Sequence, residues 1–535
     1  MRDISFDECQ FVRSLNTFKI FQGRGRQKME GFIPFFRWMD LSFLDYMTIR
    51  DLIEYGDYHN DIPLVIILMT MFSALQEGSL CLNLEKEKLL LRFPAELKER
   101  AMKIINDFLS SMSENKYERL ITRNGDEYMP LILDESRGKM LLYFQKYYFH
   151  ESRLAKRVEE FLAAEDSFKM PPQEIESILE EIYSDLCVIR IGKGRSPIMR
   201  DEKQVKAIQL AIGSQFSIIS GGPGTGKTSL MVNILRCLVR SGIRSSDIVL
   251  GAPTGRAAQR MTEAIQNNIT EIKKPSDEDL GLLDLKGNTL HKILRYMRYK
   301  NAFHYQDANP LPASVAVIDE VSMVDVVMLD TFLHALNPGK TKLILLGDKD
   351  QLPSVEAGAV FAEMIPDGMR AARFGNRLTV LQKVYRSGIH LLELAQQANQ
   401  GALPSFQTVP FKTALSIESD QWAFIDPEGA TEWKEHLYQW TKHHYIDPLS
   451  DGKKSYKELL MEAEEMSSEQ LAASELGHDI LHQIFVLVDQ ARILSIVRNG
   501  IYGCNWINAL IAEYLIREFD TSPVDGTNSF SGAFT

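Results

Sequence analysis

The sequence is poor in cysteine and has none of the cysteine spacings that hold a metal. Its five cysteines are scattered over 535 residues without a C-x-x-C pair. This distribution argues against a disulfide framework, a zinc site and an iron–sulfur cluster, and it favours a reducing compartment. We therefore expect these thiols to be small core residues of a cytoplasmic protein.

Long apolar runs and an excess of positive charge are also missing. The longest apolar stretch, residues 62–75, is too short to cross a bilayer and predicts a buried helix. The N-terminus carries acidic residues early and has no signal-peptide core. The net charge of −12 is not that of a protein coated in nucleic acid, although a local groove can still hold a single strand.

The length predicts several domains, because one core rarely serves a chain of 535 residues. Residues 1–115 show mostly helical spacing of apolar side chains, and we expect a helical N-terminal domain there. Residues 116–195 are expected to connect it, through a strand at 131–133 and a helix over 140–148, to a nucleotide-binding domain at 196–370. Residues 371–535 follow as a second domain with a looser pattern.

From residue 200 onward, short apolar runs alternate with helical segments, which is typical of an α/β fold with a parallel sheet. The expected strands are 216–219, 248–250, 315–318 and 343–346, with two more candidates at 485–488 and 493–497.

A glycine-rich loop directly after the first of these strands fits the phosphate-binding pattern G-x-x-x-x-G-K-[ST]. Its glycines let successive backbone N–H groups converge on one point, and the following helix aims its positive end there. Lys227 can reach the β- and γ-phosphates of ATP, and Thr228 can bind Mg²⁺. The candidate nucleotide-binding residues of the loop are Gly222, Pro223, Gly224, Thr225, Gly226, Lys227 and Thr228.

Two later strands end in polar residues suited to nucleotide hydrolysis. The run 315–318 is followed by Asp319, which could hold Mg²⁺, and by Glu320, which could deprotonate the attacking water. The next strand leads to Gln351, whose amide can both donate to a phosphate and accept from a water. A plain turn at Gln351 is the alternative.

Other residues are suited to nucleic acid or to the base of a nucleotide. Thr254 and Arg256 open a helix and could bind a phosphate of the nucleic-acid backbone. His291 could do the same, although a lone histidine is more often structural. Gln204, upstream of the phosphate-binding loop, is suited to an adenine edge, or is simply a polar helix residue.

Taken in order, these motifs resemble those of the superfamily 1B DNA helicases, and within them the RecD subunits of exodeoxyribonuclease V (RecBCD). The resemblance rests on Gly-Gly-Pro-Gly-Thr-Gly-Lys-Thr, Ala-Pro-Thr-Gly-Arg-Ala-Ala, Thr-Leu-His, Ile-Asp-Glu-Val-Ser-Met and Gly-Asp-Lys-Asp-Gln-Leu-Pro-Ser-Val. It is sharp over residues 200–390 and looser over 120–160 and 484–515.

The resemblance implies RecA-like domains, ATP and Mg²⁺ as cofactors, and 5′→3′ movement on single-stranded DNA. It also implies assembly with RecB-like and RecC-like subunits, through an N-terminal docking domain, for recombinational repair of double-strand breaks. The roles it implies are adenine binding by Gln204, hydrolysis by Lys227 and Glu320, coupling by Gln351, γ-phosphate sensing by Arg386, and DNA contacts by Thr254, Arg256 and His291.

The late threonine and arginine motifs of the family do not occur before residue 535. We therefore expect a second RecA-like domain that is partial, because the C-terminal part is truncated or replaced. Two alternatives stay open. One is a non-motor scaffold that binds partners and DNA, and the other is a stand-alone RecD-like helicase. The stand-alone relatives carry helix-hairpin-helix modules, for which residues 1–115 give no convincing pattern.

Overall fold

The computed structural model describes residues 35, 38–39 and 41–519, apart from short internal gaps. The gaps are 137, 167, 169, 192–195, 352–357, 359, 366–373, 386–388, 400, 403–405, 418–420 and 449–452. The chain divides into two compact units, one up to residue 386 and one from residue 387. Within the described ranges, no helix is both long and apolar enough to cross a membrane.

The N-terminal part combines helices with a small sheet, which the sequence analysis did not predict. Its sheet has the strand order β1-β4-β3-β2, and its core runs from Phe35 to Leu142. The expected boundary at residue 115 is therefore wrong, because strands on both sides of it share one sheet. The elements are α4 (Phe43–Gly56), α5 (Ile62–Gln76), β1 (Cys81–Asn83), α6 (Lys86–Leu90), α7 (Lys98–Ser113), β2 (Ile121–Thr122), β3 (Leu131–Asp134) and β4 (Leu141–Phe144).

The expected helix over 140–148 begins later than predicted. Residues Leu141–Phe144 pair with β3 and β1 as β4, and helix α8 (Gln145–Ala163) starts directly after them. Tyr143 is consequently a buried sheet residue. Residues Leu141–Phe144 form a strand because they pair with β1 on one side and with β3 on the other.

The nucleotide-binding domain is built on six parallel strands in the order β14-β7-β13-β12-β8-β9, which confirms the predicted α/β fold. All four expected strands of this domain are present. Strand β14 extends the domain beyond the expected end at residue 370, because it pairs with β7. The strands are β7 (Phe216–Gly221), β8 (Ile248–Ala252), β9 (Gly287–Thr289), β12 (Val315–Ile318), β13 (Lys342–Gly347) and β14 (Leu378–Leu381).

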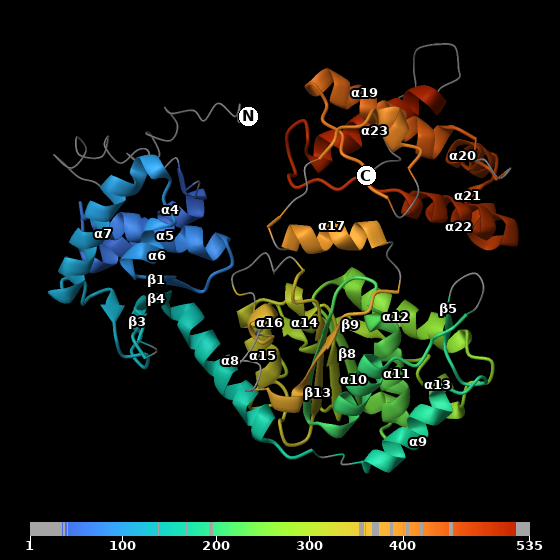
Figure 1. Cartoon of the computed structure of the whole chain (residues 1–535), viewed down its shortest axis with the longest axis horizontal. Coiled ribbons are helices and arrows are strands. Elements are labelled where there is room, and N and C mark those ends of the chain that lie inside the picture. The colour runs from blue at the N-terminus through green and yellow to red at the C-terminus, as the bar shows by residue number, and fades with distance from the viewer. Residues whose placement is uncertain are drawn as a thin grey trace. The chain divides into compact units, whose positions relative to one another are not determined.

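Helices cover both faces of this sheet (Figure 1). Successive strand residues point to opposite faces, so Val315 and Val317 of β12 pack in one core while Ala316 and Ile318 pack in the other. The first core holds α9 (Pro172–Ile182), α10 (Glu202–Gly213), α11 (Lys227–Arg240) and α12 (Gly255–Thr270). The second holds α8, α14 (Leu290–Ile293), α15 (Val326–His334) and α16 (Val360–Glu363). A strand buried on both faces is typical of parallel sheets.

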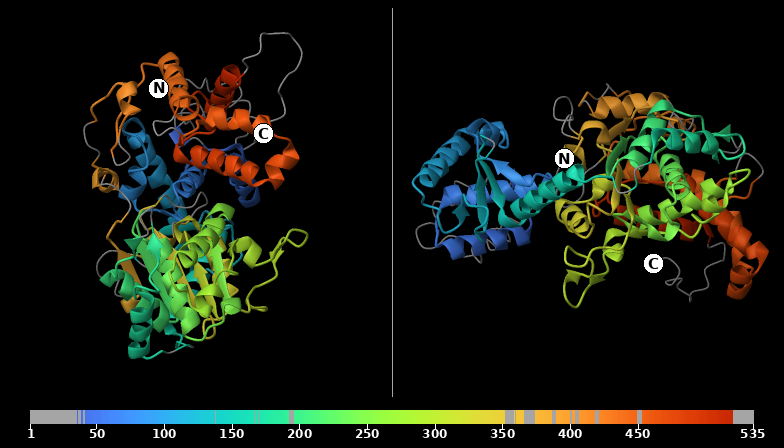
Figure 2. Two further views of the ribbon diagram at one scale, coloured as in Figure 1. Left: turned by 90° about the vertical axis from the view of Figure 1, so that its right-hand side faces the viewer. Right: turned by 90° about the horizontal axis from the view of Figure 1, so that it is seen from below.

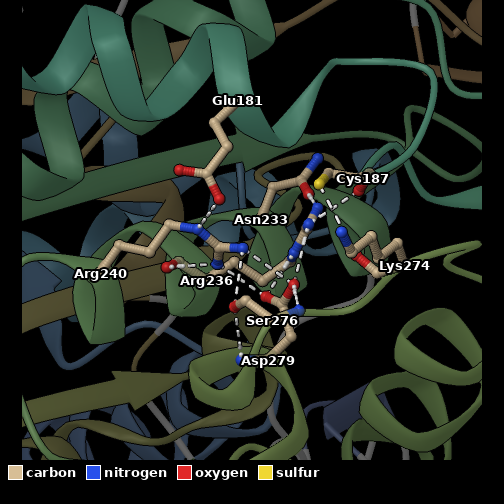
Figure 3. Close-up of polar contacts among 8 residues, drawn as sticks. All are labelled: Glu181, Cys187, Asn233, Arg236, Arg240, Lys274, Ser276 and Asp279. Atoms are coloured by element: carbon tan, nitrogen blue, oxygen red, sulfur yellow. Dashed lines mark hydrogen bonds and ion pairs between the residues drawn. The ribbon is translucent and has the colours of Figure 1, made fainter.

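A buried ion network fixes the C-terminal half of α11 (Figure 3). Asp279 of α13 (Asp277–Leu280) is fully buried. Its Oδ1 atom accepts from Arg236 Nε at 2.9 Å and from Arg240 Nη1 at 2.7 Å. Burial alone would raise the pKa of the Asp279 carboxyl, but the two arginines hold this pKa well below its usual range. Because Arg236 Nη2 also donates to the carbonyl of Cys187 at 2.8 Å, the network joins three chain segments.

Two pairs of two-residue strands also belong to the first unit, and the described residues of the second unit are mainly helical. The pairs are β5 (Arg190–Ile191) with β6 (Ser196–Pro197) and β10 (Tyr296–Met297) with β11 (Ala302–Phe303). The second unit has α17 (Ile389–Asn399), α18 (Phe411–Ala414), α19 (Ala430–Thr441), a π-helix (Lys442–Ile446), α20 (Tyr456–Glu464), α21 (Ser468–Ala473), α22 (Glu475–Gln490) and α23 (Cys504–Phe519).

Both strand candidates of the second unit are wrong. Residues 485–488 lie inside helix α22, and residues 493–497 form no strand. The described residues of this unit contain only one isolated bridge, between Thr408 and Phe424. They do not form the parallel sheet that a RecA-like domain requires.

Candidate nucleotide and nucleic-acid site

The expected site residues follow the carboxyl ends of neighbouring parallel strands. The phosphate-binding loop follows β7, the acid pair follows β12, and Gln351 comes after β13. Thr254 follows β8, and His291 comes just after β9. Parallel strands present their carboxyl ends at one edge of the sheet, where α/β proteins bind their ligands. The topology therefore collects residues from five strands at a single edge.

The phosphate-binding loop adopts a conformation that only glycine reaches easily. Gly224 and Gly226 have φ angles of 75° and 81°, in the left-handed region where a side chain is strained. Gly226 caps helix α11, and Thr225 closes the loop by donating from Oγ1 to the carbonyl of Gly222 at 2.8 Å. The helix begins at Lys227, so its first free N–H groups lie at the loop. Backbone and helix together provide an anion-binding site.

Lys227, Asp319 and Glu320 form a charged group between the ends of β7 and β12. Lys227 Nζ donates to the carbonyl of Gly221. Burial and the neighbouring Glu320 raise the pKa of the Asp319 carboxyl to about 6, while Lys227 opposes this rise. A carboxyl whose ionised form is this poorly stabilised by the protein is a suitable partner for a cation.

Glu320 has two further features of a functional residue. Its φ angle is 55°, which is rare for a residue with a side chain and costs conformational energy. Its Oε2 atom is buried and has no hydrogen-bond partner among the described residues. A buried carboxylate oxygen without a partner is costly, so it fits a site that receives a water or a cation. Together with Lys227, Asp319 and the exposed Thr228, it fits a nucleoside triphosphate with Mg²⁺.

Gln351 is attached to the segment that follows the acid pair. The hydroxyl of Ser322, two residues after Glu320, donates to Oε1 of Gln351 at 2.8 Å. Ser322 is buried and Gln351 is exposed. The contact joins the segments that follow β12 and β13, so a movement of the acid pair can be transmitted to the Gln351 side chain. Ser322 lies in the motif Ile-Asp-Glu-Val-Ser-Met, but the sequence alone indicated no role for it.

Gln204 lies against the phosphate-binding loop. It belongs to α10 and is 4% exposed. Its Nε2 atom donates to the carbonyl of Thr225 at 3.2 Å. The Gln204 side chain is therefore buried against the loop and not exposed on the surface of the helix. Next to it lies an open pocket of about 510 Å³, lined by Arg200, Asp201, Glu202, Lys203, Gln382 and Lys383.

Thr254 and Arg256 occupy the start of helix α12. Thr254 caps the helix by accepting from the N–H of Ala257 at 3.2 Å. Its hydroxyl therefore has a structural partner, which is the usual role of threonine at this position. Arg256 is exposed in the first turn, where a guanidinium and helix N–H groups could bind one phosphate together.

His291 belongs to an exposed aromatic cluster. Its ring lies 6.0 Å from that of Tyr296 and 5.7 Å from that of Phe303. These two aromatic residues come from the hairpin β10–β11, which projects from the domain in both views of Figure 2. The imidazole is accessible and supported by the hairpin, and Lys292 follows it.

Arg386, the expected γ-phosphate sensor, lies outside the described residues. The residue before it, Tyr385, donates its backbone N–H to the carbonyl of Gly224 in the phosphate-binding loop at 2.8 Å. Tyr385 was not predicted from the sequence, where its only signal was its position directly before Arg386. Asp201, the N-cap of helix α10, was not predicted either, and its only signal was its position just before that helix.

Comparisons with known proteins agree with this geometry. Residues 204–357 match the family model described as an AAA domain, a range that begins at Gln204 and includes both the loop and Gln351. The chain is 38% identical over 289 residues to the RecBCD enzyme subunit RecD of Mycolicibacterium smegmatis, covering 46% of this chain and 52% of that protein. It is 35% identical over 229 residues to the RecD subunit of Haemophilus influenzae, covering 42% of this chain and 33% of that protein.

A further relative is the ATP-dependent RecD2 DNA helicase of Deinococcus radiodurans, with 29% identity over 157 residues, or 29% of this chain and 19% of that protein. The chain spans about a third to a half of the length of the RecD subunits named above. The similarity to RecD subunits and to a RecD2 DNA helicase is therefore clear, and it covers only part of each relative.

Proposed function

We propose that this chain, a relative of the RecD helicase subunits, is an ATP-hydrolysing DNA motor that moves 5′→3′ along single-stranded DNA. The observation that carries the proposal is the convergence of five strands at one sheet edge. At that edge lie the phosphate-binding loop, the acid pair Asp319–Glu320, and Gln351, which a hydrogen bond joins to Ser322. Thr254, Arg256 and His291 lie at the same edge, after β8 and β9.

The residues at this edge of the sheet have different roles in ATP hydrolysis. Lys227 and the N–H groups of the loop bind the phosphates, and Thr228 and Asp319 hold the divalent cation. When bound, Mg²⁺ neutralises charge on the phosphates. Glu320 orients the attacking water and accepts its proton, for which its buried oxygen is suited, since it has no hydrogen-bond partner in the described part of the chain. Gln204 lies next to the open pocket and is suited to the adenine base.

The proposed DNA-facing residues follow β8 and β9, which lie at the end of the sheet farther from the loop. Arg256 and His291 are exposed there and can contact phosphates or bases without blocking the nucleotide. Ser322 follows the acid pair at the end of β12 and Gln351 follows β13, so their hydrogen bond can transmit the state of the nucleotide from one strand end to the next. This division supports a motor rather than a simple nucleotide-binding protein.

For partners, we infer RecB-like and RecC-like subunits in a cytoplasmic complex that repairs double-strand breaks by recombination, with the N-terminal domain as the docking part. The similarity to RecD subunits supports this inference. Co-expression with such subunits and affinity purification tests it. A stable complex of all three is expected, whereas recovery of the chain only as a free monomer favours a stand-alone helicase.

A non-motor scaffold is the second candidate, because the described residues after 387 form no parallel sheet that could close an ATP site. Forked DNA substrates separate the two. The motor requires ATP to open forks with a 5′ single-stranded tail and leaves forks with only a 3′ tail intact. Opening of neither fork, by the chain or its complex, favours the scaffold, and opening of the 3′-tailed fork alone contradicts the proposed direction.

A further inference from the structure

Asp201 is a small acidic residue with contacts to two separate parts of the first unit. It caps helix α10, since its Oδ1 atom accepts from the N–H groups of Lys203 and Gln204 at 3.1 Å each. Its Oδ2 atom lies 3.8 Å from Nζ of Lys383. The first contact leads to the phosphate-binding loop, and the second leads to residues 382–385, which we name the exit segment because the chain passes from it to the second unit.

On the loop side, Asp201 acts through Gln204. Capping fixes the first turn of α10, which carries the Gln204 side chain to the carbonyl of Thr225 at 3.2 Å. The fit is close, because a side chain at Gly226 would come within 2.8 Å of Nε2 of Gln204. In a trans peptide the N–H of the next residue points away from the carbonyl. By holding the Thr225 carbonyl, Gln204 therefore sets the direction of the Gly226 N–H.

On the other side, the exit segment holds the preceding peptide of the same loop. The N–H of Tyr385 donates to the carbonyl of Gly224 at 2.8 Å. The segment is held in turn by the sheet, because β14 pairs Leu381 with Gly221. Consecutive carbonyls of the loop, those of Gly224 and Thr225, thus have partners from the exit segment and from α10.

Side chains tie these two partners to each other. Lys203 Nζ donates to Oε1 of Gln382, and Lys383 Nζ lies 5.1 Å from the ring centre of Tyr385. Burial, followed by the charge of Asp201 and a hydrogen bond with it, raises the pKa of the Tyr385 phenol to about 12. The Asp201 carboxylate is therefore the group shared by α10 and the exit segment.

We propose that Asp201 is a positioning residue that couples the phosphate-binding loop to the exit segment. Nucleotide in the loop and order in the exit segment then stabilise each other, because coupling between two sites is reciprocal. The device gives the loop a direct connection to the chain that enters the second unit. This inference rests on the proposed nucleotide binding and adds to it a route by which occupancy of the loop is transmitted.

The change Asp201→Asn separates charge from capping, because asparagine caps a helix about as well as aspartate. The variant should melt at the wild-type temperature without nucleotide. Its dissociation constant for Mg·ADP should rise roughly threefold to tenfold, as for the loss of one hydrogen bond to a charged group. For ATP, the KM should rise by a similar factor while kcat stays near the wild-type value. Glu202→Gln is the matched control, since Glu202 is exposed in the same pocket.

Hydrogen exchange of the Tyr385 amide gives a measurement that a merely structural role would not change. In the wild-type protein, Mg·ADP should slow this exchange at least severalfold, and in Asp201→Asn the slowing should shrink at saturating Mg·ADP. Tyr385→Phe keeps the N–H and should weaken binding less. The double variant should bind Mg·ADP only slightly more weakly than Asp201→Asn alone, because both changes remove the same interaction, the one between Asp201 and the Tyr385 hydroxyl.

The outcomes separate this inference from the proposed function. If the wild-type chain binds Mg·ADP, Lys227→Ala does not, and Asp201→Asn equals the wild type in affinity and exchange, the coupling is wrong and nucleotide binding stands. If the wild-type chain does not bind Mg·ADP at all, both are wrong. Equal losses in Asp201→Asn and Glu202→Gln would also contradict the specific role of Asp201.

Discussion

The hydroxyl of Ser322 donates a 2.8 Å hydrogen bond to Oε1 of Gln351 and so joins the ends of two neighbouring strands. Ser322 follows the acid pair Asp319–Glu320 by two residues, and Gln351 comes after β13. Because the serine hydroxyl occupies one lone-pair direction of the amide oxygen, it fixes which way the glutamine presents its NH₂ group. The orientation of Gln351 is thereby set from the hydrolytic side of the site.

Removal of this hydroxyl should uncouple hydrolysis from DNA without removing the nucleotide. We expect Ser322→Ala to bind ATP as the wild type does and to lose roughly threefold to tenfold of its DNA-stimulated hydrolysis, in line with one lost hydrogen bond. Ser322→Thr retains a hydroxyl and is the control that should recover most of the rate. Steady-state hydrolysis with and without single-stranded DNA measures both. An unchanged stimulation in Ser322→Ala would remove the contact from the coupling.

The role of Glu320 as the general base predicts a loss of rate alone. Glu320→Gln keeps the shape of the side chain but cannot accept the proton of the attacking water. Hydrolysis should fall by about 10²-fold or more, which is the range for a general base, while the dissociation constant for ATP stays within about twofold of the wild-type value. Nucleotide titration and steady-state turnover measure the two effects separately. Similar turnover in both proteins would show that another group takes the proton.

Arg256 is expected to contact one DNA phosphate. Arg256→Ala should weaken single-stranded DNA binding to a similar extent for all sequences, and the slope of log K against log salt should fall by about one unit or slightly less. Arg244→Ala is the control, because Arg244 precedes β8 and so lies at the opposite edge of the sheet. Anisotropy titrations over a range of salt concentrations measure the slope. Identical slopes for Arg256→Ala and the wild type would exclude the contact.

The buried network around Asp279 predicts a large effect on stability. Asp279→Asn removes the buried anion that Arg236 and Arg240 share, so that Arg236 loses its charged partner and Arg240 keeps only Glu181. The free energy of unfolding should fall by about 3–5 kcal/mol at pH 7, as for a buried ion pair that loses one partner. Glu181→Gln removes only the exposed partner of Arg240 and should cost about 1 kcal/mol or less. Urea denaturation of the two variants provides the comparison.

The same network predicts how this stability difference depends on pH. The arginines lower the pKa of Asp279 in the folded state below its unfolded value of about 3.9. The carboxylate therefore contributes its full stabilisation above that unfolded value, and the contribution is lost as the pH falls through the folded-state pKa. The wild-type advantage over Asp279→Asn should be constant above about pH 5 and should shrink below about pH 4. A difference that grows on acidification would contradict the network.

The central strands of the nucleotide-binding domain were predicted well from the sequence, because each of them is a continuous apolar run. Residues 315–318 are an example, buried on both faces of the sheet. Strand β9 was not predicted, since Gly287–Thr289 contains no apolar residue that would mark a strand. In the second unit, residues 485–488 fit a strand and a buried helix equally in so short a window. The longer amphipathic helix α22 includes them.

The candidate site was likewise predictable from the sequence only in part. That the loop, Asp319 and Glu320 lie at strand ends was predictable, because each follows a continuous apolar run. Ser322, Asp201 and Tyr385 were not, because serine, aspartate and tyrosine occur everywhere and their role depends on contacts between distant segments. Tyr385 meets Gly224 only because β14 pairs beside β7. Such relations require the fold.

The most direct test of the motor is ATP hydrolysis by the purified chain, measured with and without single-stranded DNA, in the wild type and in Lys227→Ala. We expect hydrolysis that rises at least tenfold on addition of DNA and disappears in Lys227→Ala, because the lysine binds the phosphates that react. Hydrolysis that DNA leaves unchanged, or that Lys227→Ala retains, would contradict a DNA motor driven from this phosphate-binding loop.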